Sequence, residues 1–256
     1  RATALGLLLL SAERLLDALR YFAPKAELLY FPPWDCLPYD RVSPSAGVVS
    51  QRLSTLYRLT QQPVGQRITV TTVAATLLKV LPRHKLEQSG LTAKAGGVLD
   101  GEKLQAYLVL NGYLRVDTVR EPGEFARRGG LFDLFPAGRD QPLRIDLFGD
   151  TIESIRSFDP LTQMTTGNVG ELSLLPATEF SMDEDSVGRF RQAYRETFGA
   201  VLDDDTLYDA VSEGRRHPGM EHWLPFFYAG LDSIFDYTPG VPLVLAPQTE
   251  EAIDAR

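Results

Sequence analysis

Short apolar runs alternate with helical apolar spacings over the first third of the chain. Three such runs predict buried strands, over Leu5–Leu10, Glu27–Phe31 and Ile68–Val73. Apolar residues recur at helical spacing over Ala12–Phe22, Ser50–Leu59 and Ala75–Leu81. Ser11 is the expected N-cap of the first helix, and Pro82 is expected to end the third. Strands that alternate with helices predict a parallel α/β layer.

The pattern changes after residue 87. Leu86–Gly101 contains four glycines and no strong periodicity, which suits a domain boundary. A helix over Glu102–Asn111 and adjacent strands then predict a small α+β domain over residues 88–176. The segment 177–256 carries two further predicted helices and ends in a buried strand, Pro242–Ala246. We therefore predict an α/β domain that begins in residues 1–87, receives the α+β domain as an insertion and is completed by residues 177–256.

A three-strand meander is predicted within the insertion. Its strands are Leu131–Phe135, Leu143–Phe148 and Thr151–Phe158, and Gly149-Asp150 forms a tight turn between the last two. Because side chains alternate along a strand, one face carries Arg144, Asp146 and Phe148. Arginine and aromatic residues are frequent anchors of protein interfaces, so this face has the composition of a binding surface. If the faces were exchanged, Phe148 would instead pack in the core.

Composition and charge restrict the classes of function. The formal net charge of -8 and a pI near 5.0 argue against a general nucleic-acid binder, although arginines cluster locally around Arg127 and Arg144. The single cysteine, Cys36, cannot form an internal disulfide, which favours a reducing, cytoplasmic setting. The apolar run at the start is too short to span a bilayer. Since the chain begins without Met, we interpret it as a fragment of a longer protein.

Motifs of catalysis are missing from the sequence. No G-x-x-x-x-G-K-[ST] pattern is present to hold nucleotide phosphates, and no H-E-x-x-H, paired-cysteine or G-x-S-x-G motif occurs. The acidic triplets at Asp183 and Asp203 each begin a predicted helix, where capping explains them better than metal binding. We therefore expect a non-catalytic module with no cofactor and no metal.

Longer motifs carry a family resemblance. Gly123–Pro136 (GEFARRGGLFDLFP), Arg144–Asp150 (RIDLFGD) and Ser157–Pro160 (SFDP) resemble the UvrA-binding domain shared by UvrB and the bacterial transcription-repair coupling factors. Trp34–Asp40 (WDCLPYD) and Gly219–Pro225 (GMEHWLP) resemble the coupling factors specifically. The resemblance extends over essentially the whole chain. The DNA-clasping hairpin expected in UvrB after residue 40 has no counterpart here.

The resemblance implies both a fold and a partner. It implies a helicase-like, UvrB-type α/β layer that lacks a P-loop and recruits UvrA through the inserted domain. Arg128, Arg144 and Phe148 match the interface positions of the family, and three weaker candidates at the rim are Arg127, Phe125 and Asp146. Arg128 would otherwise be a solvated turn residue. In this family, the C-terminal part of the full-length protein is thought to cover the same surface by an intramolecular contact.

Two other functions compete with this non-catalytic adaptor. A fragment of a UvrB-type, ATP-dependent damage-recognition enzyme would carry a P-loop upstream of Arg1. A DNA-binding module would use the arginine-rich turn near Arg128 and bind DNA with a strong salt dependence. The acidic net charge makes direct DNA binding the weakest of the three.

Overall fold

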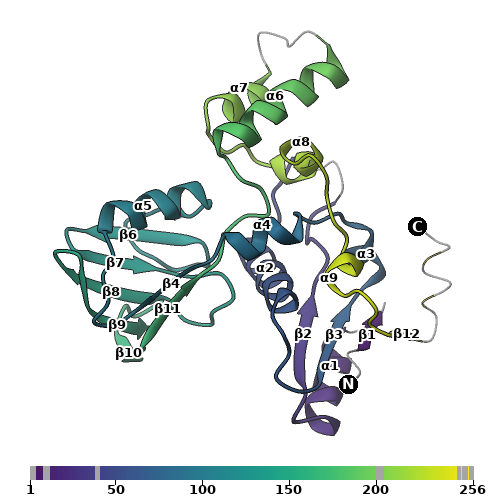
Figure 1. Ribbon diagram of the computed structural model, residues 1–256, viewed down its shortest axis with the longest axis horizontal. Helices are drawn as coiled ribbons and strands as arrows, with labels where there is room; N and C mark the ends of the chain where they lie inside the picture. The colour runs from purple at the N-terminus through teal and green to yellow at the C-terminus, as the bar shows by residue number, and fades with distance from the viewer. Residues whose placement is uncertain are drawn as a thin grey trace.

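The computed structural model describes residues 4–7, 12–37, 41–199 and 205–246, together with Thr249 and Ile253. Three parts are visible in Figure 1: a parallel α/β layer, a domain built on a six-stranded sheet, and a helical part placed above the α/β layer. The chain passes from the first part into the second and then into the third before it returns to the first.

The α/β layer is built on four parallel strands. Their order in the sheet is β12, β1, β3 and β2, and their bounds are Leu243–Leu245, Ala4–Leu7, Arg67–Thr71 and Glu27–Phe31. The last strand, β12, pairs in parallel with β1, as predicted, but it is not buried: Leu243, Val244 and Leu245 are 41–57% exposed at the edge of the sheet. The predicted N-cap Ser11 and the predicted strand residues after Leu7 lie outside the described residues.

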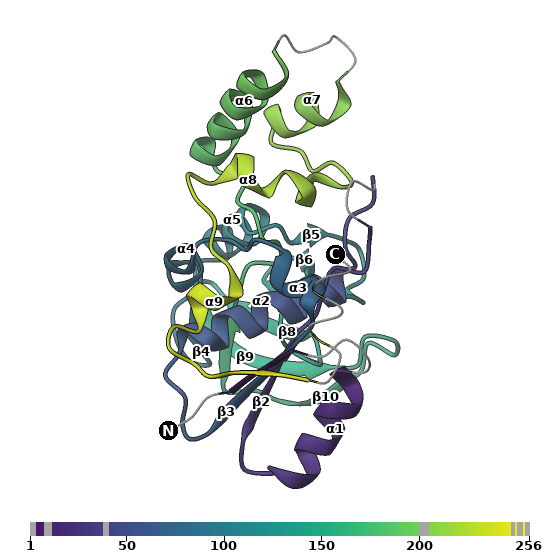
Figure 2. The ribbon, with the colours of Figure 1, turned by 90° about the vertical axis from the view of Figure 1, so that its right-hand side faces the viewer.

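Helices cover both faces of this sheet. On β2, Leu28 and Tyr30 point to α1 (Ala12–Phe22), whereas Leu29 and Phe31 point to α2 (Ala46–Thr60). Figure 2 shows α1 and α2 separated by the strands. Apolar residues at every position of the strand are thus explained by burial on two sides, which is the usual condition of a parallel sheet.

The helix predicted over Ala75–Leu81 is shorter and is followed by a second one. The structure has α3 over Val73–Leu77, where the Thr72 side chain accepts a hydrogen bond from the Ala75 N–H. Pro82 does not end a helix but is the N-cap residue of α4 (Arg83–Gln88), with a φ of -62°. A proline is compatible with the start of a helix because its missing N–H has no partner there.

The second domain contains the predicted meander within a larger sheet. The order of its strands is β10, β9, β8, β7, β6 and β5, with bounds Thr165–Asn168, Thr151–Phe158, Leu143–Phe148, Leu131–Leu134, Glu124–Arg128 and Leu114–Arg115. A two-stranded ribbon of β4 (Leu91–Lys94) and β11 (Glu171–Leu174) closes one side. The region predicted as a nonperiodic boundary therefore contains β4 as well as the end of α4.

One face of the six-stranded sheet packs against α5 (Gly101–Leu110). The fully buried side chains of this core come from the helix and from alternate positions of the strands: Leu104, Leu108, Phe125, Phe132, Leu134, Leu143, Ile145 and Ile152. Asp100 caps the helix by accepting hydrogen bonds from two backbone N–H groups. The opposite face of the sheet, which we call the outer face, is not covered by α5.

The helical part holds the remaining helices except α9. Their bounds are α6 Glu184–Phe198, α7 Thr206–Ser212, the 3-10 helix η1 Met220–Trp223 and α8 Leu224–Phe227, whereas α9 (Ile234–Tyr237) packs in the core of the α/β layer beside α2. Aromatic rings fill its core around Phe190, which is fully buried. Asp183 caps α6 and Asp205 caps α7 through their side chains, which confirms the capping interpretation of the acidic segments.

A buried ion pair joins the α/β layer to the segment that leaves the second domain. The Arg52 guanidinium on α2 donates to both carboxylate oxygens of Glu179, and their side chains are 0% and 2% exposed. Arg52 also donates to the Pro32 carbonyl over 2.8 Å and lies 4.2 Å from the ring centroid of Phe31. All charge in this buried region is therefore compensated locally.

We expect Arg52→Ala to lower the free energy of unfolding by about 3–5 kcal/mol, since it leaves the Glu179 carboxylate buried without a counter-charge. The double variant Arg52→Met with Glu179→Leu has no unpaired charge, so it should regain most of the lost free energy of unfolding. Urea unfolding of the three variants checks this. An Arg52→Ala variant within about 1 kcal/mol of wild type would contradict it.

Candidate protein-binding face

The outer face is organised by strand alternation in β8. Leu143, Ile145 and Leu147 are buried toward α5, whereas Phe148 is 77% exposed on the other side. Arg144 and Asp146 share the side of Phe148. The structure thus places these three candidates on one face, as the alternation predicted.

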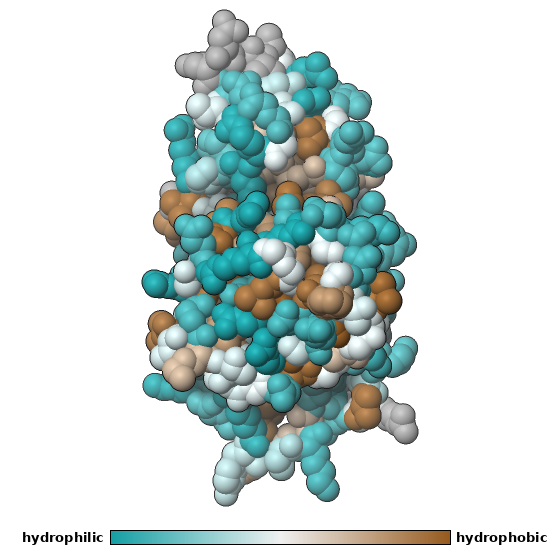
Figure 3. All heavy atoms as spheres, turned by 90° about the vertical axis from the view of Figure 1, so that its left-hand side faces the viewer, coloured by the Kyte–Doolittle hydropathy of each residue, from teal (hydrophilic) through white to brown (hydrophobic). Residues whose placement is uncertain are grey.

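Cross-strand pairing extends this face from β8 across β7 to β6. Arg128 of β6 pairs with Leu131 of β7, and Leu131 pairs with Asp146 of β8. Residues paired in this way lie on the same face, so Arg128 joins the row of Asp146. Figure 3 looks onto the side of the molecule that carries this domain, where apolar residues lie in small groups separated by hydrophilic ones.

Arg144 is held by a carboxylate within the same face. Its Nε donates to Asp133 Oδ1 over 2.7 Å and its Nη2 donates to Oδ2 over 2.9 Å. The guanidinium also lies 4.8 Å from the ring centroid of Phe158, and the side chains of Arg144 and Asp133 are 19% and 4% exposed. The hydrogen bonds to Asp133 raise the pKa of Arg144 above its ordinary value, so the guanidinium stays charged.

A glycine turn positions Arg128 at the edge of the face. Gly129 and Gly130 connect β6 to β7, and Gly129 has a φ of +63°. A Cβ on Gly130 would lie 2.4 Å from the Leu147 carbonyl oxygen, so only glycine fits where this turn meets β8. Arg128 is exposed and donates from Nη2 to the Asp117 carbonyl over 2.7 Å.

Two of the weaker candidates are not on the outer face. Arg127 points to the α5 side, where it donates to Glu102 and Gln105 and lies 5.1 Å from the ring centroid of Phe132. The hydrogen bond from Arg127 lowers the pKa of Glu102. Phe125 is fully buried in the core beneath α5, so its expected place at the rim is corrected: its side chain has no surface to offer a partner.

Two residues of this face were not foreseen from the sequence. Asp133 is the buried partner of Arg144, and Arg156 of β9 lies directly opposite Arg144. Arg156 reaches the outer face because β9 carries a bulge: Asp146 pairs with Ser154 and Leu147 pairs with Ile152, which leaves Glu153 unpaired. The apolar spacing of three between Ile152 and Ile155 is the signal in the sequence that indicates such a bulge.

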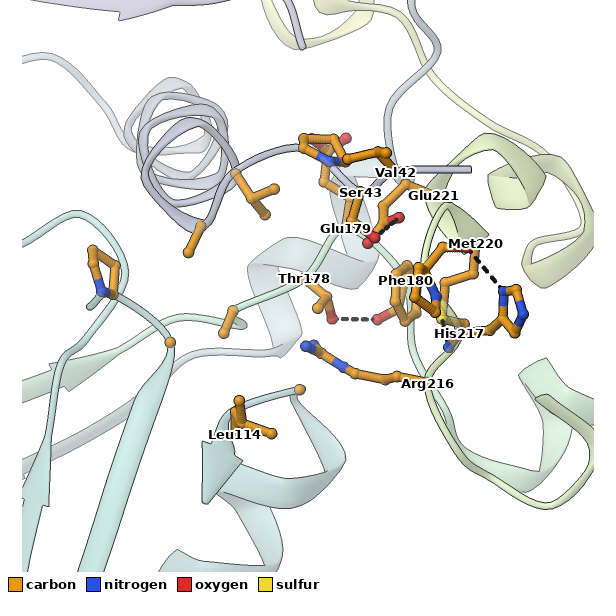
Figure 4. Close-up of a pocket in the computed structure, with 18 of the residues that line it drawn as sticks. Val42, Ser43, Leu114, Thr178, Glu179, Phe180, Arg216, His217, Met220 and Glu221 are labelled. Carbon is orange, nitrogen blue, oxygen red and sulfur yellow. Dashed lines mark hydrogen bonds between the residues drawn. The ribbon is translucent and has the colours of Figure 1, made fainter. Parts of the chain in front are cut away.

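A cavity of about 640 Å³ lies elsewhere, at the junction of the three parts of the molecule. Figure 4 shows Arg216 extending across it toward Thr178. Glu221 accepts a hydrogen bond from Ser43 over 2.7 Å, and the His217 ring contacts the Pro218 carbonyl and Thr206. These polar side chains fix the junction and do not form a nucleophile and base pair.

Two further findings concern only the described residues. Among them, no group of three or more His, Cys, Asp or Glu side chains is arranged to hold a metal ion. Within the same ranges, no helix is long and apolar enough to cross a membrane.

The second domain is thus a sheet with an exposed aromatic residue and arginines on one face, mounted on an α/β layer. This domain resembles a known family. Residues 91–180 match the model of the UvrB interaction domain family. These residues include the entire outer face, from Arg128 to Phe158.

Most of the chain is similar to transcription-repair-coupling factors. It is 39% identical to that of Haemophilus influenzae over 83% of this chain and 18% of the relative, and 38% identical to that of Escherichia coli over 92% and 20%. The factor of Bacillus subtilis is 27% identical over 93% and 21%. The chain thus spans about a fifth of the length of these relatives. The resemblance to the coupling factors is confirmed, and these matches favour it over a UvrB-type enzyme.

We expect Arg144→Ala to destabilise the second domain by about 3 kcal/mol, because it leaves the Asp133 carboxylate buried and unpaired. Arg128→Ala removes an exposed arginine from the same face and should change the free energy of unfolding by less than about 0.5 kcal/mol. Thermal unfolding of the two variants distinguishes them. Equal melting temperatures would show that the Asp133 pair does not stabilise the domain.

Proposed function

We propose that this chain is a non-catalytic adaptor module that recruits UvrA in nucleotide excision repair, and that the outer face is the docking surface. The observation that carries the proposal is the coincidence of two findings. The match to the UvrB interaction domain covers the six-stranded sheet, and that sheet exposes Phe148 and Arg128 on the face opposite α5.

The chemistry of the outer face supports protein binding. Phe148 has 77% of its surface exposed and lies at the end of β8, next to the Gly149-Asp150 turn. A large aromatic side chain that is desolvated by a partner is a frequent anchor of an interface. Arg128, which is exposed, supplies a guanidinium at one end of the next row. An apolar anchor and a cationic side chain are thus available on the same face.

The proposal includes an organisation of the chain. Residues 1–87 and 177–256 would form one helicase-like α/β domain without a P-loop, and residues 88–176 would be an insertion that carries the docking surface. The parallel pairing of β12 with β1 supports this, since the end of the chain returns to its first strand. We place the module in the cytoplasm, where it would meet UvrA on DNA under repair. Genomic sequence upstream of Arg1 that encoded a P-loop would contradict this assignment.

We expect Phe148→Ala to weaken binding of this chain to purified UvrA by about 2 kcal/mol, roughly 30-fold, because an interface anchor is removed. Phe22→Ala is the matched control: it removes a phenylalanine that is 81% exposed on α1 of the α/β layer. Titration calorimetry gives the affinities, and melting temperatures report the fold of each variant.

An equal loss of UvrA affinity in Phe148→Ala and Phe22→Ala would mean that exposed aromatic residues contribute to binding wherever they lie on the surface. Full affinity of Phe148→Ala would remove the outer face from the proposal, although another face of the chain would then still bind UvrA. A wild-type chain that does not bind UvrA at micromolar concentration would contradict the adaptor function itself.

We further propose that an intramolecular contact with the C-terminal part of the full-length protein covers this face, as the family resemblance implies. The relatives are about five times longer than this chain, so a covering segment has ample chain to come from. The full-length protein should therefore bind UvrA more weakly than this chain does. Equal affinities, measured under the same conditions, would contradict the contact.

A further inference from the structure

Two arginines face each other across the outer face. Arg144 of β8 and Arg156 of β9 are directly opposite in the register of the two strands. Like charges in this position repel each other unless carboxylates balance them. Asp133 balances Arg144, and Asp146 lies 3.5 Å from Nη2 of Arg156.

The hydrogen bonds of the two arginines differ. Arg144 uses Nε and Nη2 for two short hydrogen bonds to Asp133. The same two nitrogens of Arg156 are almost unused: Nε is buried without a hydrogen-bond partner, and the contact of Nη2 with Asp146 is at the limit of hydrogen-bond distance. The side chain of Arg156 is 34% exposed, against 19% for Arg144.

This difference decides which arginine is available to a partner. A carboxylate that took Arg144 would break two strong hydrogen bonds and leave Asp133 buried and unpaired. Arg156 would lose one weak contact by turning outward, and its Nε would gain the partner that it lacks. A guanidinium binds a carboxylate most strongly through two parallel N–H bonds, which Arg156 can still form.

We infer, on the basis of the docking function proposed above, that Arg156 binds an acidic side chain of UvrA, and that Arg144 is a positioning residue that holds Asp133 and Phe158 in place. The strand rises by about 3.3 Å per residue, so Phe148 lies roughly 13 Å from the row of Arg144 and Arg156. The complementary surface therefore carries a carboxylate and, at that distance, an apolar contact for Phe148.

Asp146 has a defined effect in this arrangement. Its carboxylate is 40% exposed and lies between Phe148 and Arg144 along β8, near Arg156. It attracts the Arg156 guanidinium and repels an incoming carboxylate. Asp146→Asn should therefore tighten UvrA binding, whereas a direct hydrogen bond from the partner to Asp146 would make the same variant bind more weakly.

The test measures UvrA affinity of the whole chain for wild type, Arg156→Ala, Arg156→Lys and Asp146→Asn, each at several NaCl concentrations. Arg195→Ala is the control, because it removes an exposed arginine in the last turn of α6, in the helical part. We expect Arg156→Ala to lose at least about tenfold in affinity and to show a weaker salt dependence than wild type. Arg156→Lys should retain part of the affinity, and the control should behave as wild type.

The outcomes separate this inference from the function on which it rests. If wild type binds and Arg156→Ala binds equally well, the inference is overturned and the docking function stands. If wild type does not bind UvrA, both the docking function and the inference about Arg156 are overturned. If Arg156→Ala also lowers the melting temperature, the salt dependence of the remaining UvrA affinity distinguishes the two roles. A purely structural role would leave this salt dependence as in wild type, which would overturn the inference.

Discussion

The buried Arg52–Glu179 ion pair is the contact on which the arrangement of the molecule depends. It joins α2 of the α/β layer to the segment that follows β11, at the point where the chain leaves the second domain. Trp34 and Tyr228 add hydrogen bonds to Glu179, so groups from before and after the second domain converge on one residue. Because a buried charge is stable only when it is paired, the chain must return to this place for the α/β layer to be complete.

Buried charges are also paired on the outer face, but the neighbouring groups there are left exposed or without a partner. Its most buried charges, Asp133 and Arg144, pair with each other, and the Arg144 guanidinium also lies over the ring of Phe158. On the same face, Phe148 is 77% exposed, and Nε of Arg156 has no hydrogen-bond partner. A partner that contacts Phe148 and Arg156 would break few existing hydrogen bonds and would leave the Arg144–Asp133 pair intact. Such an arrangement is suited to binding.

The part of this face that follows strict alternation was predictable from the sequence. The apolar and polar positions of β8 are those of an ideal strand, and the Gly149-Asp150 turn lies where the pattern placed it. Arg156 was not found, because a regular strand from Thr151 would have turned it inward and only the bulge at Glu153 brings it outward. Phe125 was misplaced for a simpler reason: its position in a shared motif says nothing about which face it occupies, whereas alternation from Arg128 would have turned it inward.

The fold shows the same limits. β2 was found because it is apolar on both faces, and α6 and α7 because acidic caps precede them. The short strands β4 and β11 were not found, since small and polar residues interrupt their patterns and they pair with each other across a long stretch of sequence. β6 was not found because charged residues interrupt its pattern, although its partner β7 follows directly. Pro82 was assigned to the end of a helix when it precedes one, because proline is compatible with both positions.

The most direct test of the central claim, that the outer face docks UvrA, is site-specific photocrosslinking. One probe would replace Phe148 on the outer face and the other Val109, which is 59% exposed on α5 at the opposite face of the sheet. Mixed with UvrA, the chain should crosslink from position 148 and not from position 109. Crosslinking from position 109 alone would contradict the claim, because it would place the partner on the other side of the domain.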